Sequence, residues 1–201
     1  MDLSPTVLAG NIVRLEPLSY QHTAGLLAAA AYDSIWTYLD EPTPRTMEDA
    51  ETLIRDARED QARGVRLPFA TIATDNDEIV GSISLIDIRQ RDRAVEVGWA
   101  WLTPRRWGTG ASREAIFLLM RHAFETMGVV RVAYKTDSRN TRSQNSIIGL
   151  GATKEGILRN HRILSDGYVR DSVYYSIIPE EWPAVRERFE RQQGHRLPAT
   201  R

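Results

Sequence analysis

The sequence predicts one α/β domain built around a single, largely antiparallel sheet, and three observations lead to this fold class. The chain has 201 residues, 42% of them apolar, which is enough for one mid-sized core. Its hydrophobic pattern changes from a helical period to a period of two near position 69, and back again near position 111. Turn residues separate the period-two segments, so we expect consecutive strands to pair as an antiparallel meander.

The first third of the chain predicts a short strand followed by two helices. The strand is expected over 11–15, and the Ala- and Leu-rich segment 20–32 has the composition of a helix. A second helix is expected over 46–63. It begins at Thr46 and has Asp49 three positions later, a spacing that is typical of a capping box.

The rest of the chain predicts the meander, three more helices and a hairpin that turns at Asp166-Gly167. Together the elements form one domain over 1–201, with a core at about 11–178 and a frayed tail over 194–201. Strands are expected over 69–74, 79–87, 95–102 and 130–135, and helices over 111–127, 142–150 and 180–191.

Composition and charge exclude several classes of function. The formal net charge is −1, which gives no electrostatic reason to expect nucleic acid or an anionic membrane as a partner. No run of 18 apolar residues is present, and the N-terminus does not have the pattern of a secretory signal. The chain has no cysteine, which fits the cytoplasm, and its four histidines lack the spacing of a metal site, so no metal is expected.

The segment "LTPRRWGTGASREAI", 102–116, carries two glycines between a predicted strand and a predicted helix. It lacks the lysine of the ATP-binding loop and the third glycine of the dinucleotide fingerprint, so a nucleotide-dependent enzyme is not favoured. Gly108 and Gly110 can turn successive N–H groups toward an anion at the helix N-terminus. A simple glycine turn with solvated arginines explains the residues equally well.

Two motifs resemble the GNAT N-acetyltransferase superfamily. "RRWGTG" matches its [QR]-x-x-G-x-[GA] signature, and "SRNTRSQNSIIGLGATKEGILRNHRILSDGYVRDSVYYSI" resembles its Rim-type branch, which acetylates the N-termini of ribosomal proteins. Ala152 stands where that branch often has Phe, a departure that leaves the substrate open. The resemblance implies a mixed, mostly antiparallel sheet with helices on both faces, and acetyl-CoA as cosubstrate.

The resemblance also implies a binding site for acetyl-CoA between the strand that ends at Leu102 and the next strand, 130–135. Backbone groups after the first strand would pair with the pantetheine arm, and the glycine loop would surround the pyrophosphate. The expected cofactor-binding residues are Trp101, Leu102, Thr103, Arg105, Arg106, Trp107, Gly108, Thr109, Gly110, Ala111, Asn140 and Asn145.

Glu96 is the candidate general base, because it lies in the strand 95–102 beside small residues that leave space for a substrate. Strict alternation would place Val95, Val97, Trp99 and Trp101 on one face and Glu96, Gly98, Ala100 and Leu102 on the other. Partial burial would raise the pKa of such a carboxyl toward neutrality. A solvated Glu96, paired with an arginine such as Arg89, is the alternative.

Ser143 matches the serine that the Rim-type branch is proposed to use to protonate the CoA thiolate. The alternative is that Ser143 caps the N-terminus of the helix over 142–150. Tyr134 and Tyr174 are weaker candidates for the acid, and His161 lies on the hairpin near the expected acceptor side.

The linker "DSIWTYLDEPTP", 33–44, is the candidate acceptor wall. Trp36 and Tyr38 would line a pocket, and acidic neighbours such as Glu41 would attract a cationic amine. The alternative is a loop whose two aromatic residues pack on the core.

The sequence therefore predicts an N-acetyltransferase that moves an acetyl group to a primary amine, on a protein N-terminus or a small molecule. A non-catalytic acyl-CoA-binding module is the competing interpretation, because Glu96 and Ser143 both have structural explanations. A homodimer is a further expectation, since the Rim-type branch often pairs through sheet edges or C-terminal hairpins.

Overall fold

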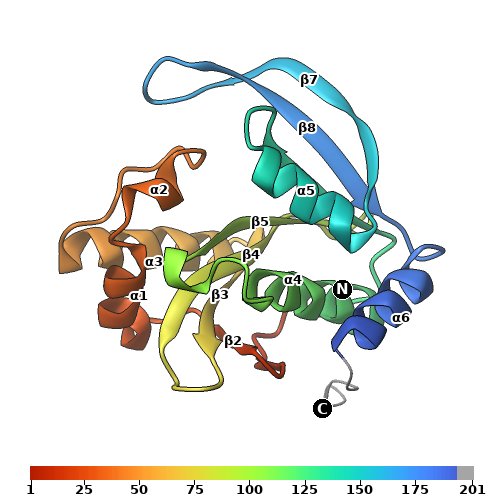
Figure 1. The fold of residues 1–201 in the computed structure, drawn as a ribbon, viewed down its shortest axis with the longest axis horizontal. Helices are drawn as coiled ribbons and strands as arrows, with labels where there is room; N and C mark the ends of the chain where they lie inside the picture. The colour runs from red at the N-terminus through yellow and green to blue at the C-terminus, as the bar shows by residue number, and fades with distance from the viewer. Residues whose placement is uncertain (194–201) are drawn as a thin grey trace.

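One eight-stranded sheet with helices on both faces organises the computed structural model, which describes residues 1–193 (Figure 1). The strand order is β1-β2-β3-β4-β5-β6-β8-β7. Every neighbouring pair is antiparallel except β5 and β6, which are parallel. The strands are β1 (Leu8–Ala9), β2 (Val13–Pro17), β3 (Arg66–Ala73), β4 (Ile79–Arg89), β5 (Ala94–Leu102), β6 (Arg131–Asp137), β7 (Thr153–Ile163) and β8 (Val169–Ile177).

The helices divide between the two faces of the sheet. Helices α4, α5 and α6 contribute to the main core, whereas α1, α2 and α3 cover the opposite face through two smaller clusters. No helix among residues 1–193 is long and apolar enough to cross a membrane. The helices are α1 (Thr23–Ala30), α2 (Asp33–Trp36), α3 (Met47–Ala62), α4 (Ala111–Arg121), α5 (Thr141–Leu150) and α6 (Trp182–Gln193).

Local sequence signals account for most of these elements. The predicted capping box of α3 is confirmed, since the Thr46 side chain accepts from the Asp49 N–H while the Asp49 carboxylate accepts from the Thr46 N–H. Strand β3 is buried along nearly its whole length because helices cover one face and the main core covers the other.

Some elements differ from the sequence prediction. The helix expected over 111–127 is α4 followed by a π-helical turn, His122–Thr126. The short β1 and the single-turn α2 were not predicted, because two to four residues carry no readable period. The tail expected to fray, 194–201, lies outside the described residues.

The two parallel strands, β5 and β6, separate from each other toward their C-terminal ends. Only residues Ala94–Val97 of β5 pair with β6, through Arg131–Tyr134. Strand β5 nevertheless continues to Leu102, and β6 continues to Asp137. Past Val97 and Tyr134 the two strands diverge, so their facing backbone edges do not pair with each other.

A β-bulge in β5 overturns the predicted alternation of its side chains. Gly98 pairs with Ser84 and Trp101 with Ser82, so the register between the two strands shifts by one residue in this interval. Trp99 takes a left-handed φ of 48° in the bulge, an uncommon conformation for a bulky residue. The extra residue changes the phase of the strand. Consequently Leu102 joins Val97 in the main core, and Trp101 packs on the opposite face.

A buried carboxylate fixes the start of α4 against the N-terminal segment. Glu114, in the first turn of the helix, is fully buried and accepts from the N–H groups of Asn11, Ile12 and Val13 at 3.0, 2.6 and 2.8 Å. A carboxylate with three N–H donors is well satisfied despite its burial. This contact holds the helix whose N-terminus faces the glycine loop.

Candidate active site

A cleft of about 330 Å³ lies where β5 and β6 diverge. Its walls include the second half of each strand, the N-terminal turns of α4 and α5, and Trp107 and Gly108 of the loop that precedes α4. Unpaired strand edges on both sides offer N–H and C=O groups to an extended ligand. The cleft therefore suits a long chain that carries amide groups.

The glycine loop forms an anion-binding surface at one end of the cleft. Gly108 and Gly110 have φ values of 75° and 89°, and Gly110 is the N-cap of α4. Within residues 1–193, no hydrogen bond uses the N–H groups of Gly108, Thr109 or Gly110. Three free N–H groups at a helix N-terminus match a phosphate or pyrophosphate.

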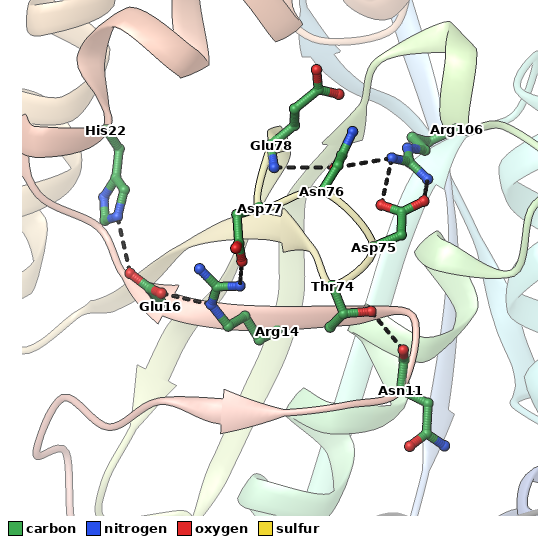
Figure 2. A network of polar contacts seen from close by, with 10 residues as sticks. All are labelled: Asn11, Arg14, Glu16, His22, Thr74, Asp75, Asn76, Asp77, Glu78 and Arg106. Carbon is green, nitrogen blue, oxygen red and sulfur yellow. Dashed lines mark hydrogen bonds and ion pairs between the residues drawn. The ribbon is translucent and has the colours of Figure 1, made fainter.

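Arg106 holds this loop in place through its side chain. Its guanidinium makes two 2.8 Å bonds to the Asp75 carboxylate in the turn between β3 and β4, and this lowers the pKa of Asp75 (Figure 2). Arg14 of β2 anchors the same turn through Asp77. Arg106 thus stabilises the loop, whereas the neighbouring Arg105 is exposed, with no partner among the described residues.

Trp107 and Arg142 meet across the mouth of the cleft. The Trp107 indole N–H donates to the Leu102 carbonyl at 2.9 Å, and the Arg142 guanidinium lies 3.8 Å from the centre of the indole ring. The contact joins the loop before α4 to the first turn of α5. Arg142 was not among the predicted site residues, because an arginine in a helix gives no sequence signal of a distant aromatic partner.

Asn140, rather than Ser143, caps α5. The Asn140 side-chain oxygen accepts from the Ser143 N–H at 3.0 Å, so the capping alternative for Ser143 is wrong. Ser143 lines the cleft together with Ser146, one helical turn later. Asn145 is exposed and does not line the cleft.

Glu96 is buried and paired with a lysine. Only 4% of the residue is exposed, and its Oε2 lies 3.2 Å from the Lys135 Nζ on β6. Burial raises the pKa of Glu96, and the lysine opposes that rise. The alternative of a solvated Glu96 paired with Arg89 is wrong, since Arg89 pairs with Asp87 and Asp92. Lys135 and Gly98, on either side of Glu96, line the cleft itself.

Two tyrosines and a histidine complete the polar surroundings. The Tyr134 hydroxyl is buried without a hydrogen-bond partner among residues 1–193, and Tyr134 lines the cleft. Burial raises the pKa of that hydroxyl. On the hairpin, His161 lies 3.0 Å from the Ser172 hydroxyl and 3.4 Å from the Tyr174 hydroxyl. His161 therefore belongs to a side-chain network beside β6.

Trp36 and Tyr38 line two different cavities. Tyr38 lines the cleft between β5 and β6, whereas Trp36 lines a second cavity, of about 210 Å³, between the sheet and helices α1–α3. Trp99 and Trp101 line both, so the two spaces adjoin. The second cavity also contains Glu41 and Arg66, and burial lowers the pKa of Arg66 to about 10.

The tip of the β7–β8 hairpin meets the segment after α2 above the cleft. The Ser165 N–H donates to the Asp40 carboxylate at 2.8 Å. Arg139 lies 3.4 Å from the ring centre of Tyr168 and 5.9 Å from that of Tyr38. In Figure 1 the hairpin extends past α5 toward α2, and these contacts cover that side of the site.

Comparison with known proteins agrees with this geometry. The family model described as "Acetyltransferase (GNAT) domain" matches residues 13–153, more than half of the chain. This chain belongs to the GNAT acetyltransferase family. The function and the class of enzyme expected from the sequence are thereby confirmed, and the family uses acetyl-CoA as acetyl donor.

Relatives of this GNAT protein cover nearly its whole length. The uncharacterized N-acetyltransferase YoaA of Bacillus subtilis is 25% identical over 174 residues, which are 86% of this chain and 96% of YoaA. The ribosomal-protein-serine acetyltransferase of Escherichia coli is 21% identical, over 89% of this chain and 100% of the relative. A solved structure described as an acetyltransferase from T. thermophilus is 36% identical, has a TM-score of 0.85, and is matched over 96% of this chain and 99% of its own.

The residues of the GNAT cleft fit acetyl-CoA. The free N–H groups of the glycine loop suit its pyrophosphate, and the diverging strand edges suit the amides of its pantetheine arm. The predicted residues Trp101, Leu102, Trp107, Gly108, Asn140 and Ser143 line the cleft, whereas Thr103, Arg105, Arg106, Thr109, Gly110, Ala111 and Asn145 do not. All of the latter except Asn145 belong to the loop and helix start at one end of the cleft. Sequence reasoning missed the cleft-lining residues Ser112, Lys135, Arg142, Ser146 and Arg170.

Proposed function

We propose that this acetyltransferase moves the acetyl group of acetyl-CoA to a primary amine by direct attack. The amine nitrogen bonds to the thioester carbonyl carbon, the carbon–sulfur bond breaks, the nitrogen loses one proton, and the thiolate gains one. The observation that carries the proposal is the cleft between the diverging β5 and β6, with free loop N–H groups at its end. Nothing in the comparisons favours a non-catalytic acyl-CoA-binding module.

Glu96 is the proposed base. Its raised pKa and its place beside the cleft-lining Lys135 and Gly98 support this role. Because Glu96 is buried, a water molecule would pass the amine proton to it. The positive charge of Lys135 opposes the effect of burial and favours the ionised carboxylate.

Ser143 or Tyr134 is the proposed donor to the thiolate. Ser143 is supported because its side chain lines the cleft while Asn140 performs the capping. The Tyr134 hydroxyl is supported by its burial in the cleft without a partner among the described residues. A hydrogen bond from either hydroxyl would stabilise the developing negative charge on sulfur.

The acceptor side is proposed to include Trp36 and Tyr38, through the two adjoining cavities that they line. A protein N-terminus, as in Rim-type enzymes, and a small-molecule amine are both compatible with those spaces. Release of CoA thiol, measured over a panel of amines and N-terminal peptides, tests the activity. Tight CoA binding without turnover of any amine would instead favour the binding-module interpretation.

We further propose a cytoplasmic homodimer. The cytoplasm is supported by the lack of cysteine, and the dimer by the exposed edge strand β7. Strand β7 presents Ile157, Leu158 and Ile163, the last of them 72% exposed, along its length. An exposed edge with apolar side chains is a pairing surface. A sedimentation coefficient that does not change with concentration and equals that of a monomer would exclude the dimer.

A further inference from the structure

Arg170, the second residue of β8, is a buried cation without a partner among the described residues. Only 7% of it is exposed, and its side chain lines the cleft between β5 and β6. No hydrogen bond or ion pair joins it to any residue of the described chain, and its Nε is fully shielded from solvent. A guanidinium stays charged even where burial lowers its pKa. Burying such a charge without a counterion is costly, so a ligand that supplies one would be favoured.

The acidic groups near Arg170 already have cationic partners. Glu96 pairs with Lys135 at 3.2 Å. Asp137 accepts two bonds from the Arg139 guanidinium, at 3.1 and 2.9 Å, and one from the Arg139 N–H. Across the hairpin, Arg162 pairs in register with Arg170 and adds further positive charge. The described groups around Arg170 thus carry an excess of positive charge.

The position of Arg170 in the sheet indicates which ligand supplies the anion. Val173 and Tyr175 of β8 pack in the main core with α4, so the alternating residues Arg170, Ser172 and Tyr174 face the other side of the sheet. The Lys135 Nζ lies over the Tyr174 ring, which places Lys135 on that same side. The glycine loop proposed for the pyrophosphate precedes α4, on the opposite face. The anion near Arg170 would therefore come from the acceptor.

We propose that Arg170 binds a carboxylate of the acceptor, so that the preferred substrates carry both an amine and a carboxylate. This inference rests on the proposed function and narrows its substrate class. Arginine binds carboxylates through two parallel N–H···O bonds, and burial strengthens such bonds. Free amino acids and peptides with an acidic residue near the N-terminus share this chemistry.

Matched acceptors test the proposal without any mutation. Acetylation kinetics are measured for free amino acids against their amides, and for tripeptides with Asp or Glu at the second position against Asn or Gln. In one of the two sets, the KM of the wild-type enzyme is expected to be about tenfold to hundredfold lower for the acids than for the amides. The set that shows this difference tells whether the bound carboxylate is that of a free amino acid or of an acidic side chain. Equal KM values for acids and amides in both sets would overturn the proposal.

Two variants, Arg170→Gln and Arg170→Lys, show whether Arg170 is responsible for the preference for acids over amides. Arg162→Gln is the control for the loss of a positive charge alone. Arg170→Gln is expected to remove the preference for acids by raising their KM with kcat unchanged, and Arg170→Lys to restore part of it. Arg162→Gln should keep the preference, because Arg162 is exposed. An equal fall of kcat for acids and amides would overturn the proposal and place Arg170 at the reacting carbonyl.

Direct binding separates this inference from the proposed function. The same acceptors are titrated calorimetrically into the protein saturated with CoA. If no amine is acetylated but acids still bind more tightly than amides, and only in proteins that keep Arg170, then the proposed reaction fails and the inference stands. If acetylation occurs without discrimination between acids and amides, the inference fails and the reaction stands.

Discussion

The donor end and the acceptor end of the site are built differently. At the donor end, backbone groups face the ligand: three loop N–H groups and the open edges of β5 and β6. At the acceptor end, side chains such as Lys135, Tyr38 and Arg170 converge from β6, the segment after α2 and β8. A backbone site needs glycines at fixed positions, which a short motif can encode. A side-chain site depends on long-range packing, so its residues are scattered along the chain.

Among these variants, Gly110→Glu is expected to have the largest effect, which is a loss of CoA affinity. A glutamate there would place a carboxylate at the anion-binding helix N-terminus, in a backbone conformation with a φ of 89° that side chains rarely adopt. We expect CoA affinity, measured by calorimetry, to fall at least about a thousandfold, or ~4 kcal/mol. Gly128→Glu is the matched control, because Gly128 also has a positive φ and lies at the far end of the α4 segment. If Gly110→Glu binds CoA normally, the donor end is not where we place it.

Glu96→Gln should affect chemistry and leave donor binding unchanged. Loss of a general base is expected to lower kcat about a hundredfold at pH 7. The KM for acetyl-CoA should not change, since Glu96 does not line the cleft. Glu155→Gln, which removes the partner of Arg131 at the sheet surface, is the control for the loss of an ion pair. A normal kcat in Glu96→Gln would mean that the amine proton leaves directly to water.

The Lys135→Met variant tests how the acceptor end sets the pKa of its base. The positive charge of Lys135 lowers the pKa of Glu96, against the effect of burial, so its removal raises that pKa further. Activity requires ionised Glu96 and therefore increases as pH rises through this pKa. We therefore expect the acidic limb of the kcat profile to move to higher pH. A limb that stays in place would show that Glu96 does not control it.

Arg106→Gln is expected to have the smallest effect, which is a slight weakening of CoA binding. If Arg106 only anchors the loop through Asp75, its loss should weaken CoA binding by no more than about fivefold, since exposed ion pairs contribute up to ~1 kcal/mol. Asp75→Asn should then have the same effect, and the double variant should add nothing to it. A much larger loss in Arg106→Gln than in Asp75→Asn would mean that Arg106 contacts the pyrophosphate itself.

The order of helices and strands and the glycine loop could be predicted from the sequence, because both depend on local signals. The capping box at Thr46, the apolar and β-branched runs of β3 and β4, and the two glycines of the loop can each be read within a few residues. The loop's anchor could not be read in this way, since Arg106 and Asp75 are 31 positions apart.

The predicted alternation of side chains along β5 is wrong after Gly98. The bulge at Trp99 reverses the inside–outside pattern after Gly98, and no local signal marks it, because a tryptophan with a left-handed φ is unexpected. The residues that surround Glu96 and Arg170 depend on which strands become neighbours. Their environments therefore had to come from the structure.

A crystal structure with bound CoA is the most direct test of the proposed donor site. We predict that the pyrophosphate lies within hydrogen-bond distance of the N–H groups of Gly108, Thr109 and Gly110. The pantetheine arm should run between β5 and β6, and the sulfur should lie where the strands diverge, near Val97 and Tyr134. A CoA molecule bound outside this cleft, or with its pyrophosphate away from the loop, would contradict the account.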